Sequence, residues 1–176
     1  MNYLYHLVPE NMEGKILYPL NKLKIVYPES YEEEIKKYQK RKSLLKTKIP
    51  VLDCLWNDVL HLTAVNPKII KETLKEIGFK PPRKRWYKID PKKLEKEKTI
   101  IYLYNYNGNN KGYMTEKDFK NYDPNELEEY SDLPEKTFNY YKREFSKKIK
   151  PLLFVHIPHI LYKGFLNISK LEIIIA

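Results

Sequence analysis

The chain has 176 residues, and its hydrophobic fraction of 42%, with 14% aromatic, is enough to fill a core and argues against intrinsic disorder. The single cysteine, Cys54, excludes an intramolecular disulfide, and no apolar run approaches the roughly 18 residues of a membrane span. The net charge of +10 favours phosphate-rich partners over cationic ones. We therefore expect one cytoplasmic domain over residues 1–176 with no membrane partner.

Strand and helix patterns alternate along the first half of the chain. Residues 3–8, YLYHLV, predict a strand with Tyr5 and His6 on opposite faces. Ser30 and Glu33 have the spacing of a capping box and predict the start of a helix at residue 30. The other segments predicted in this half are extended at 49–56 and 58–65 and helical at 66–78, with Asn66 as the cap and Gly78 as the terminator.

The second half opens with a predicted basic loop, KPPRKRWYK, at residues 80–88. Residues 99–107 then predict a strand that a turn at 107–112 closes. The remaining segments are predicted to be helical at 123–130 and 133–148, extended at 151–158, a connector at 159–164, and extended in two short pieces within 165–176. This order predicts a single α+β domain with mixed or antiparallel sheets and flanking helices.

The basic loop at 80–88 combines cations with aromatic rings. Arg83, Lys84 and Arg85 can contact phosphates, and the neighbouring Trp86 offers a ring on which a base can stack. These residues are therefore a candidate nucleic-acid site. A basic loop packed over a core tryptophan has the same pattern, and both interpretations stay open.

All four histidines lie in or beside predicted strands, where an imidazole is either a hydrogen-bonded structural group or part of a site. His156 and His159 have the spacing of metal ligands on a helix. Pro158 between them argues against a helix through both, and no acid or cysteine stands alongside as a third ligand. We therefore expect no metal site.

Glu172 is the only acid in the apolar C-terminal run LEIIIA. An ionised carboxylate in such a strand is costly unless it faces a pocket or a partner. A glutamate on an edge strand that points to water fits the pattern equally well.

The start of the chain resembles a known enzyme family. Tyr5 and His6 end the first strand, Pro-Glu-Asn follows at 9–11, and an apolar pair stands at 16–17. This arrangement resembles the opening of DarT-type ADP-ribosyltransferases, in which a strand-borne histidine precedes a short helical turn containing Asn. The resemblance implies an ADP-ribosyltransferase-like fold, with NAD as a substrate and no metal.

The resemblance also implies roles for particular residues. In this superfamily a first-strand His or Arg holds the nicotinamide ribose, a middle strand faces the nicotinamide, and a glutamate on a late strand stabilises the cationic transition state. His6, with Tyr5, would bind NAD, and His61 or Thr63 on the middle strand would face the nicotinamide pocket. Glu172, with His61, would be catalytic. We then expect His6 and Glu172 within about 10 Å of each other across a cleft.

Two departures from the family pattern concern the acceptor of ADP-ribose. The middle strand has no Ser-Thr-Ser motif, and Lys170 stands two residues before Glu172, where many protein-modifying members carry Glu or Gln. Transfer to arginine is thereby put in doubt. A nucleic-acid acceptor, or a degenerate copy without activity, fits better with the basic surface, and a protein acceptor stays open.

Two other functions remain as alternatives. His61-Leu62-Thr63 resembles one half of a two-histidine phosphoesterase, but that chemistry needs a second His-x-Thr or His-x-Ser strand, and the sequence has only one. The other alternative is a basic module without enzymatic activity that binds nucleic acid or an acidic protein, in which the histidines are structural.

Overall fold

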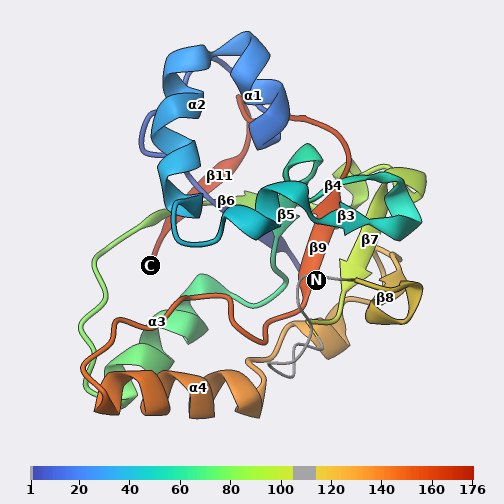
Figure 1. Cartoon of the computed structure of the whole chain (residues 1–176). Coiled ribbons are helices and arrows are strands. Elements are labelled where there is room, and N and C mark those ends of the chain that lie inside the picture. Colours follow the sequence, from blue (N-terminus) through green and yellow to red (C-terminus); the bar gives the residue numbers. More distant parts are fainter. Residues whose placement is uncertain (1, 105–113) are drawn as a thin grey trace.

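Two antiparallel sheets form the framework of the molecule and meet at one β-bridge. The computed structural model describes residues 2–104 and 114–176 (Figure 1). The first sheet has the order β1-β6-β11, and its strands are Leu4–Leu7, Arg85–Ile89 and Glu172–Ile175. The second sheet has the order β5-β9-β7-β8, and its strands are Leu60–Leu62, His159–Tyr162, Thr99–Tyr102 and Phe119–Asn121. Tyr5 of β1 and Thr63, just after β5, exchange backbone hydrogen bonds of 2.8 and 3.0 Å, which join the two sheets.

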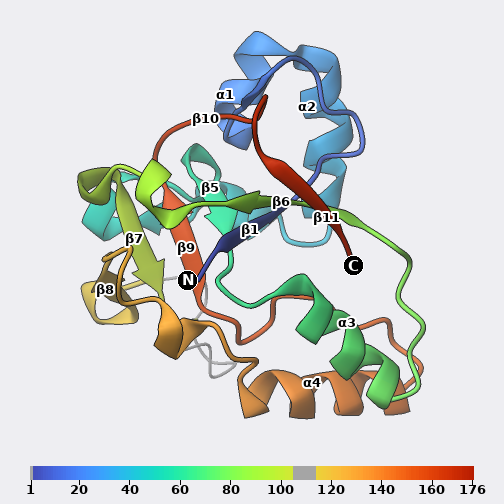
Figure 2. The same ribbon diagram turned by 180° about the vertical axis from the view of Figure 1, so that it is seen from behind.

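Two small ladders and four α-helices complete the described part of the chain. The two-stranded ladders pair β2 (Ile16–Leu17) with β10 (Leu166–Asn167) and β3 (Lys48–Ile49) with β4 (Cys54–Leu55). The helices are α1 (Leu20–Val26), α2 (Pro28–Ile35), α3 (Pro67–Glu76) and α4 (Glu135–Ser146). Helices α1 and α2 lie together at one end of the molecule, and α3 and α4 lie at the other end (Figures 1 and 2). The short 3-10 helices are η1 (Lys36–Tyr38), η2 (Lys42–Lys46), η3 (Pro50–Leu52), η4 (Trp56–Asp58), η5 (Pro91–Lys93), η6 (Lys96–Lys98), η7 (Glu116–Asp118) and η8 (Glu128–Tyr130).

Strand β9 lies in the middle of the core and is buried on both faces. Ile160 belongs to a cluster that also takes in Leu4 of the first sheet, whereas Leu161 packs with Trp56 on the other face. Because both faces are covered, every residue of the strand after His159 is apolar or aromatic, and the sequence shows no alternation of period two. The strand therefore supports two layers of packing at once.

The predicted α+β class and the antiparallel arrangement of the sheets are confirmed. Helix α3 begins as expected, because the side chain of Asn66 accepts a hydrogen bond of 3.0 Å from the backbone N–H of Lys68. It also ends as expected, at Gly78, whose φ of 89° lies in the left-handed region. Strands β1, β10 and β11, helix α4, and β7 up to Tyr102 also lie within their predicted segments.

Six local predictions are wrong in whole or in part. Residues 49–56 are not one extended segment, because η3 separates β3 from β4. Residues 151–158 form no strand, and β9 begins at His159, in the predicted connector. Ser30 is buried inside α2, and its hydroxyl donates to the Asn11 carbonyl, so it does not cap a helix. The predicted basic loop runs into β6 from Arg85 onward, and only η8 is helical within 123–130. Within 99–107, the described residues beyond Tyr102 are not in a strand, and residues 105–107 and the predicted turn at 107–112 lie outside the described residues.

None of the helices in the described part of the chain combines the length and the apolar character needed to cross a membrane.

Candidate functional site

A cavity of about 1000 Å³ has both residues of the bridge between the two sheets, Tyr5 and Thr63, in its lining. Its walls come from β1, α1, the short helices η1, η2 and η4, strand β5, residues 152–159 and α4. This volume is at the upper end of the range for small-molecule sites and can hold a dinucleotide. All four histidines line the cavity, although they are up to 153 positions apart in the sequence (His6 and His159).

Three of these imidazoles are held by hydrogen bonds to backbone carbonyls. Nδ1 of His6 donates to the carbonyl of His61 over 2.8 Å, and Nε2 of His61 donates to the carbonyl of Trp56 over 2.9 Å. Nδ1 of His159 donates to the carbonyl of Ile157 over 2.7 Å. Because a carbonyl oxygen only accepts, each bond fixes which ring nitrogen carries the proton in the neutral ring. The other nitrogen of each ring is then an acceptor.

Burial keeps these imidazoles uncharged at neutral pH. Burial, and to a lesser extent repulsion from His159, whose ring centroid is 6.2 Å away, lower the pKa of His61 to about 3. Burial likewise lowers the pKa of His159 to about 4 and shifts the pKa of His6 downward. The histidines therefore offer the cavity lone pairs and ring faces but no positive charge.

Aromatic rings surround the same histidines. The ring of Trp56 lies 4.4 Å from that of His61 and 6.0 Å from that of His159, measured between centroids. Tyr102 and Tyr104 lie 6.1 and 5.5 Å from His159. Such electron-rich faces attract a cationic ring, and the neutral imidazoles do not oppose it.

Charged side chains of both signs also line the cavity, and the acidic ones are Glu34 and Asp118. Lys37 and Arg41 come from η1 and the segment after it, and Arg143 comes from α4. Arg41 lies over the ring of Tyr38, with 5.8 Å between its guanidinium carbon and the ring centroid. Lys37 is paired with Glu34 and Arg143 with Glu144, so these two cations would have to change partner to bind a phosphate.

Asn57 is the one buried side chain of the described residues whose polar atoms have no hydrogen-bond partner. It lies in η4, it lines the cavity, and only 2% of its surface is exposed. Both its amide oxygen and its amide nitrogen are unpaired. Such an unsatisfied group costs roughly 1–3 kcal/mol, so it needs an explanation.

Four of the residues predicted from the sequence line the cavity, although the side chain of Tyr5 points to the opposite face of β1 from that of His6 and packs with Trp86. His6 and His61 are joined by a hydrogen bond, and Tyr5 and Thr63 form the bridge between the sheets beside them. The sequence reasoning did not assign a role at this site to His159, Trp56 or Asn57. The sequence singles out His159 only by its position beside a predicted strand and its spacing from His156, and nothing in the spacing singles out Asn57.

Glu172 does not belong to this site. Its side chain is 59% exposed and forms a salt bridge of 2.8 Å with Lys88. In the sheet register Glu172 lies opposite Lys88, which pairs with Tyr5, whereas His6 pairs with Tyr87. Paired residues point to the same face, so His6 and Glu172 point to opposite faces of the first sheet. The expected approach of these two side chains across a cleft is wrong, and Glu172 is an edge-strand glutamate that faces water.

Two of the candidate nucleic-acid residues, Arg83 and Lys84, precede β6, and the other two, Arg85 and Trp86, are its first residues. Arg83 and Arg85 are exposed and Lys84 is half-buried, so their charges can reach a polyanion. Trp86 is only 3% exposed and packs edge-on against Phe154, with ring centroids 5.9 Å apart. The prediction that a base stacks on Trp86 is therefore wrong, because the ring is part of the core.

Within residues 2–104 and 114–176, no three His, Cys, Asp or Glu side chains lie close enough together to hold a metal ion.

No protein-family model matches the chain, and no curated protein and no solved structure matches it either.

Proposed function

We propose that the protein binds NAD in the histidine-lined cavity and transfers ADP-ribose to an acceptor, as an ADP-ribosyltransferase. The observation that carries the proposal is that His6 of the first strand and His61 of the middle strand share one dinucleotide-sized cavity. These are the two positions that the resemblance to ADP-ribosyltransferases links to the nicotinamide riboside.

The charges of the cavity support NAD as the ligand. The nicotinamide ring of NAD is a cation, and it suits the aromatic faces of Trp56 and Tyr102 beside neutral histidines. The pyrophosphate is an anion, and it suits Arg41 and, once their ion pairs with Glu34 and Glu144 open, Lys37 and Arg143.

The reaction itself is a substitution at C1′ of the nicotinamide ribose. The bond from C1′ to the ring nitrogen breaks, its electron pair goes to that nitrogen, and nicotinamide leaves as a neutral molecule. C1′ then bonds to a nucleophilic atom of the acceptor, whose proton passes to solvent. Nδ1 of His6 carries the proton and donates it in the hydrogen bond to the His61 carbonyl. Nε2 of His6 is therefore free of a proton and accepts a hydrogen bond from a ribose hydroxyl.

In the family pattern a glutamate on a late strand stabilises the cationic transition state, and in the proposal His159 takes this role. Strand β9 pairs with β5, the strand that carries His61. The residue of β9 that lines the cavity is His159. In the proposal the lone pair of His159 and the rings around it face the positive charge that develops on the ribose, and Glu172 takes no part.

The experiment is a measurement of NAD binding by calorimetry together with nicotinamide release. Loss of a group that holds the ribose should weaken NAD binding by about tenfold in His6→Ala and slow turnover as well. Glu172→Gln is the matched control, because Glu172 lies outside the cavity, and it should change neither quantity by more than about twofold. Wild-type protein that neither binds nor consumes NAD would remove the proposal.

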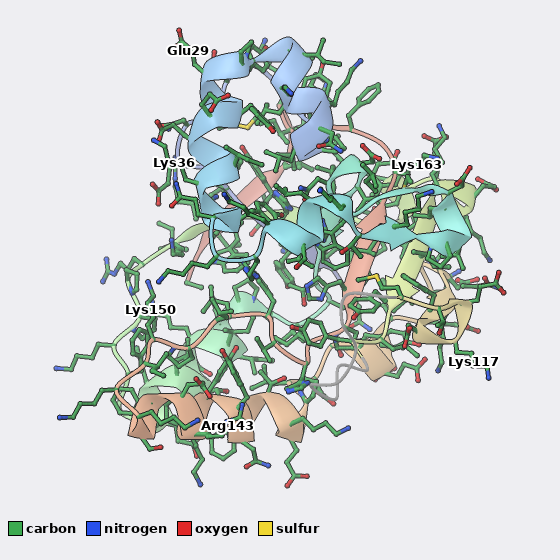
Figure 3. The ribbon with its side chains drawn as sticks, viewed as in Figure 1. Glu29, Lys36, Lys117, Arg143, Lys150 and Lys163 are labelled. Atoms are coloured by element: carbon green, nitrogen blue, oxygen red, sulfur yellow. The ribbon has the colours of Figure 1, made fainter. Side chains whose placement is uncertain are left out.

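A basic nucleic-acid-binding module is the second candidate, favoured by one surface. Residues 80–85 carry four cations and no acid, and this segment starts beside the C-terminal end of α4, where the rings of Phe79 and Phe145 lie 6.1 Å apart. The following residues, 147–150, add three exposed lysines, and Figure 3 labels Lys150 among them. Such a surface attracts a phosphate backbone whether or not the cavity is active.

A further inference from the structure

The orphaned amide of Asn57 is placed for a ligand rather than for the fold. Its oxygen can accept and its nitrogen can donate, both atoms are buried, and neither has a partner in the protein. The residue lines the same cavity as His6, His61 and His159. If the fold required only a side chain of this size at position 57, an apolar residue would fill the same space and leave no polar atom unpaired.

The short helix η4 that carries Asn57 is held from several sides. The carboxylate of Asp58 accepts from the backbone N–H of Leu55 and from the side chain of Asn21, both over 2.7 Å. The backbone N–H of Trp56 donates to Thr47 over 2.8 Å, and its carbonyl accepts from His61. Asn57, which lines the cavity, is therefore carried on a fixed support.

The chemistry of the amide defines the ligand group that pairs with it. A donor and an acceptor side by side in one plane are matched by a group with an acceptor and a donor, such as a carboxamide. A carboxylate or a phosphate has acceptors only and would leave the amide oxygen of Asn57 unpaired. The neighbouring residue, Trp56, lies against His61, and together they form the aromatic wall on which a flat ring can stack.

We infer that Asn57 recognises the carboxamide of the nicotinamide ring, so that the cavity selects NAD over the dinucleotide that carries nicotinic acid. This inference rests on the proposed function. It places the nicotinamide against Trp56 and His61, next to the strand on which His6 is anchored. The dinucleotide with nicotinic acid should bind more weakly, because its carboxylate cannot donate a hydrogen bond to the amide oxygen of Asn57.

The experiment compares the affinities of NAD and of its nicotinic-acid analogue by calorimetry. Wild-type protein should bind NAD at least about tenfold more tightly. In Asn57→Leu, which keeps the approximate volume without polar atoms, the preference should fall to within about threefold, and Tm should stay the same or rise, because no buried polar group is left unpaired. Asn57→Ala should lose the preference too and serves if the larger side chain does not fit. Asn121→Leu, at an exposed position on β8 outside the cavity, is the matched control and should keep the preference.

The outcomes separate this inference from the proposed function. If wild-type protein binds both dinucleotides equally, or if either Asn57 variant keeps the preference, the inference is wrong while NAD binding stands. A cavity water that satisfies Asn57 would give the first of these results. If wild-type protein binds neither dinucleotide, both the inference and the proposed function fall.

Discussion

Lowering the pH from 7 to 5.5 should destabilise the protein by about 2.5 kcal/mol, because the cavity holds His61 and His159 in the neutral form. In the unfolded chain each imidazole takes up its proton near the ordinary pKa of 6.5, whereas the folded pKa values are about 3 and 4. Since the folded values are lowered, the full stability is present above pH 6.5 and falls as the unfolded chain is protonated. Between pH 7 and 5.5, protonation of each of these histidines stabilises the unfolded chain by about 1.2 kcal/mol relative to the folded one.

The burial of His6 also lowers its pKa, so this residue adds to the loss in the same direction. The assay is urea denaturation, followed by tryptophan fluorescence at several pH values between 7 and 5.5. His159→Gln removes one of the main groups, so its loss of stability over this pH range should be smaller by about 1.2 kcal/mol. A free energy of unfolding that stays constant to within about 0.5 kcal/mol over this range would mean that the imidazoles titrate normally, and the claim that burial keeps them neutral would be wrong.

Three further predictions concern other parts of the molecule. Glu172→Gln should change the free energy of unfolding by no more than about 1 kcal/mol in a denaturation experiment, because it removes an exposed ion pair; a larger loss would mean that the carboxylate is buried after all. Ile160→Ala should cost about 2–5 kcal/mol, because β9 is fully buried between two clusters, and a cost under about 1 kcal/mol would contradict that packing. Replacing Arg83, Lys84 and Arg85 by Ala should weaken binding to mixed DNA or RNA and flatten its salt dependence by about one unit of slope per lost phosphate contact, and an unchanged slope would mean that these cations are only solvated.

Helix α3 could be predicted from the sequence because its signals are local. Asn66 caps it, Pro67 occupies its first turn, and Gly78 takes the left-handed conformation that ends it. The pairing of His6 and His61 in one site could be predicted only through the family resemblance. Nothing in the spacing of these two residues indicates the bridge that brings their strands together.

Strand β9 and its histidine were missed because their signals are tertiary. A strand buried on both faces has no alternating pattern, and the more apolar run at 151–158 therefore looked like the better strand. His159 was consequently placed in a connector. The structure puts it at the start of a central strand, where burial lowers its pKa.

Glu172 and Trp86 were assigned to the wrong environments for a related reason. A lone glutamate among isoleucines has the same sequence whether its strand is central or at an edge, and only the order β1-β6-β11 makes it an edge residue. A tryptophan after three cations likewise looks exposed. Both faces of β6 are covered, so Trp86 is in the core beside Phe154, whereas Arg85, at the first position of the strand, stays in solvent.

The central claim is that NAD occupies the cavity, and Trp56 offers the most direct test of it. The chain has two tryptophans, and Trp86 lies outside the cavity lining, so Trp86→Phe leaves Trp56 as the only tryptophan fluorophore. Titration of this variant with NAD should give saturable quenching of its fluorescence, because the nicotinamide ring stacks on the wall that Trp56 forms. Fluorescence that does not change up to millimolar NAD, in a variant that is folded by circular dichroism, would contradict the account.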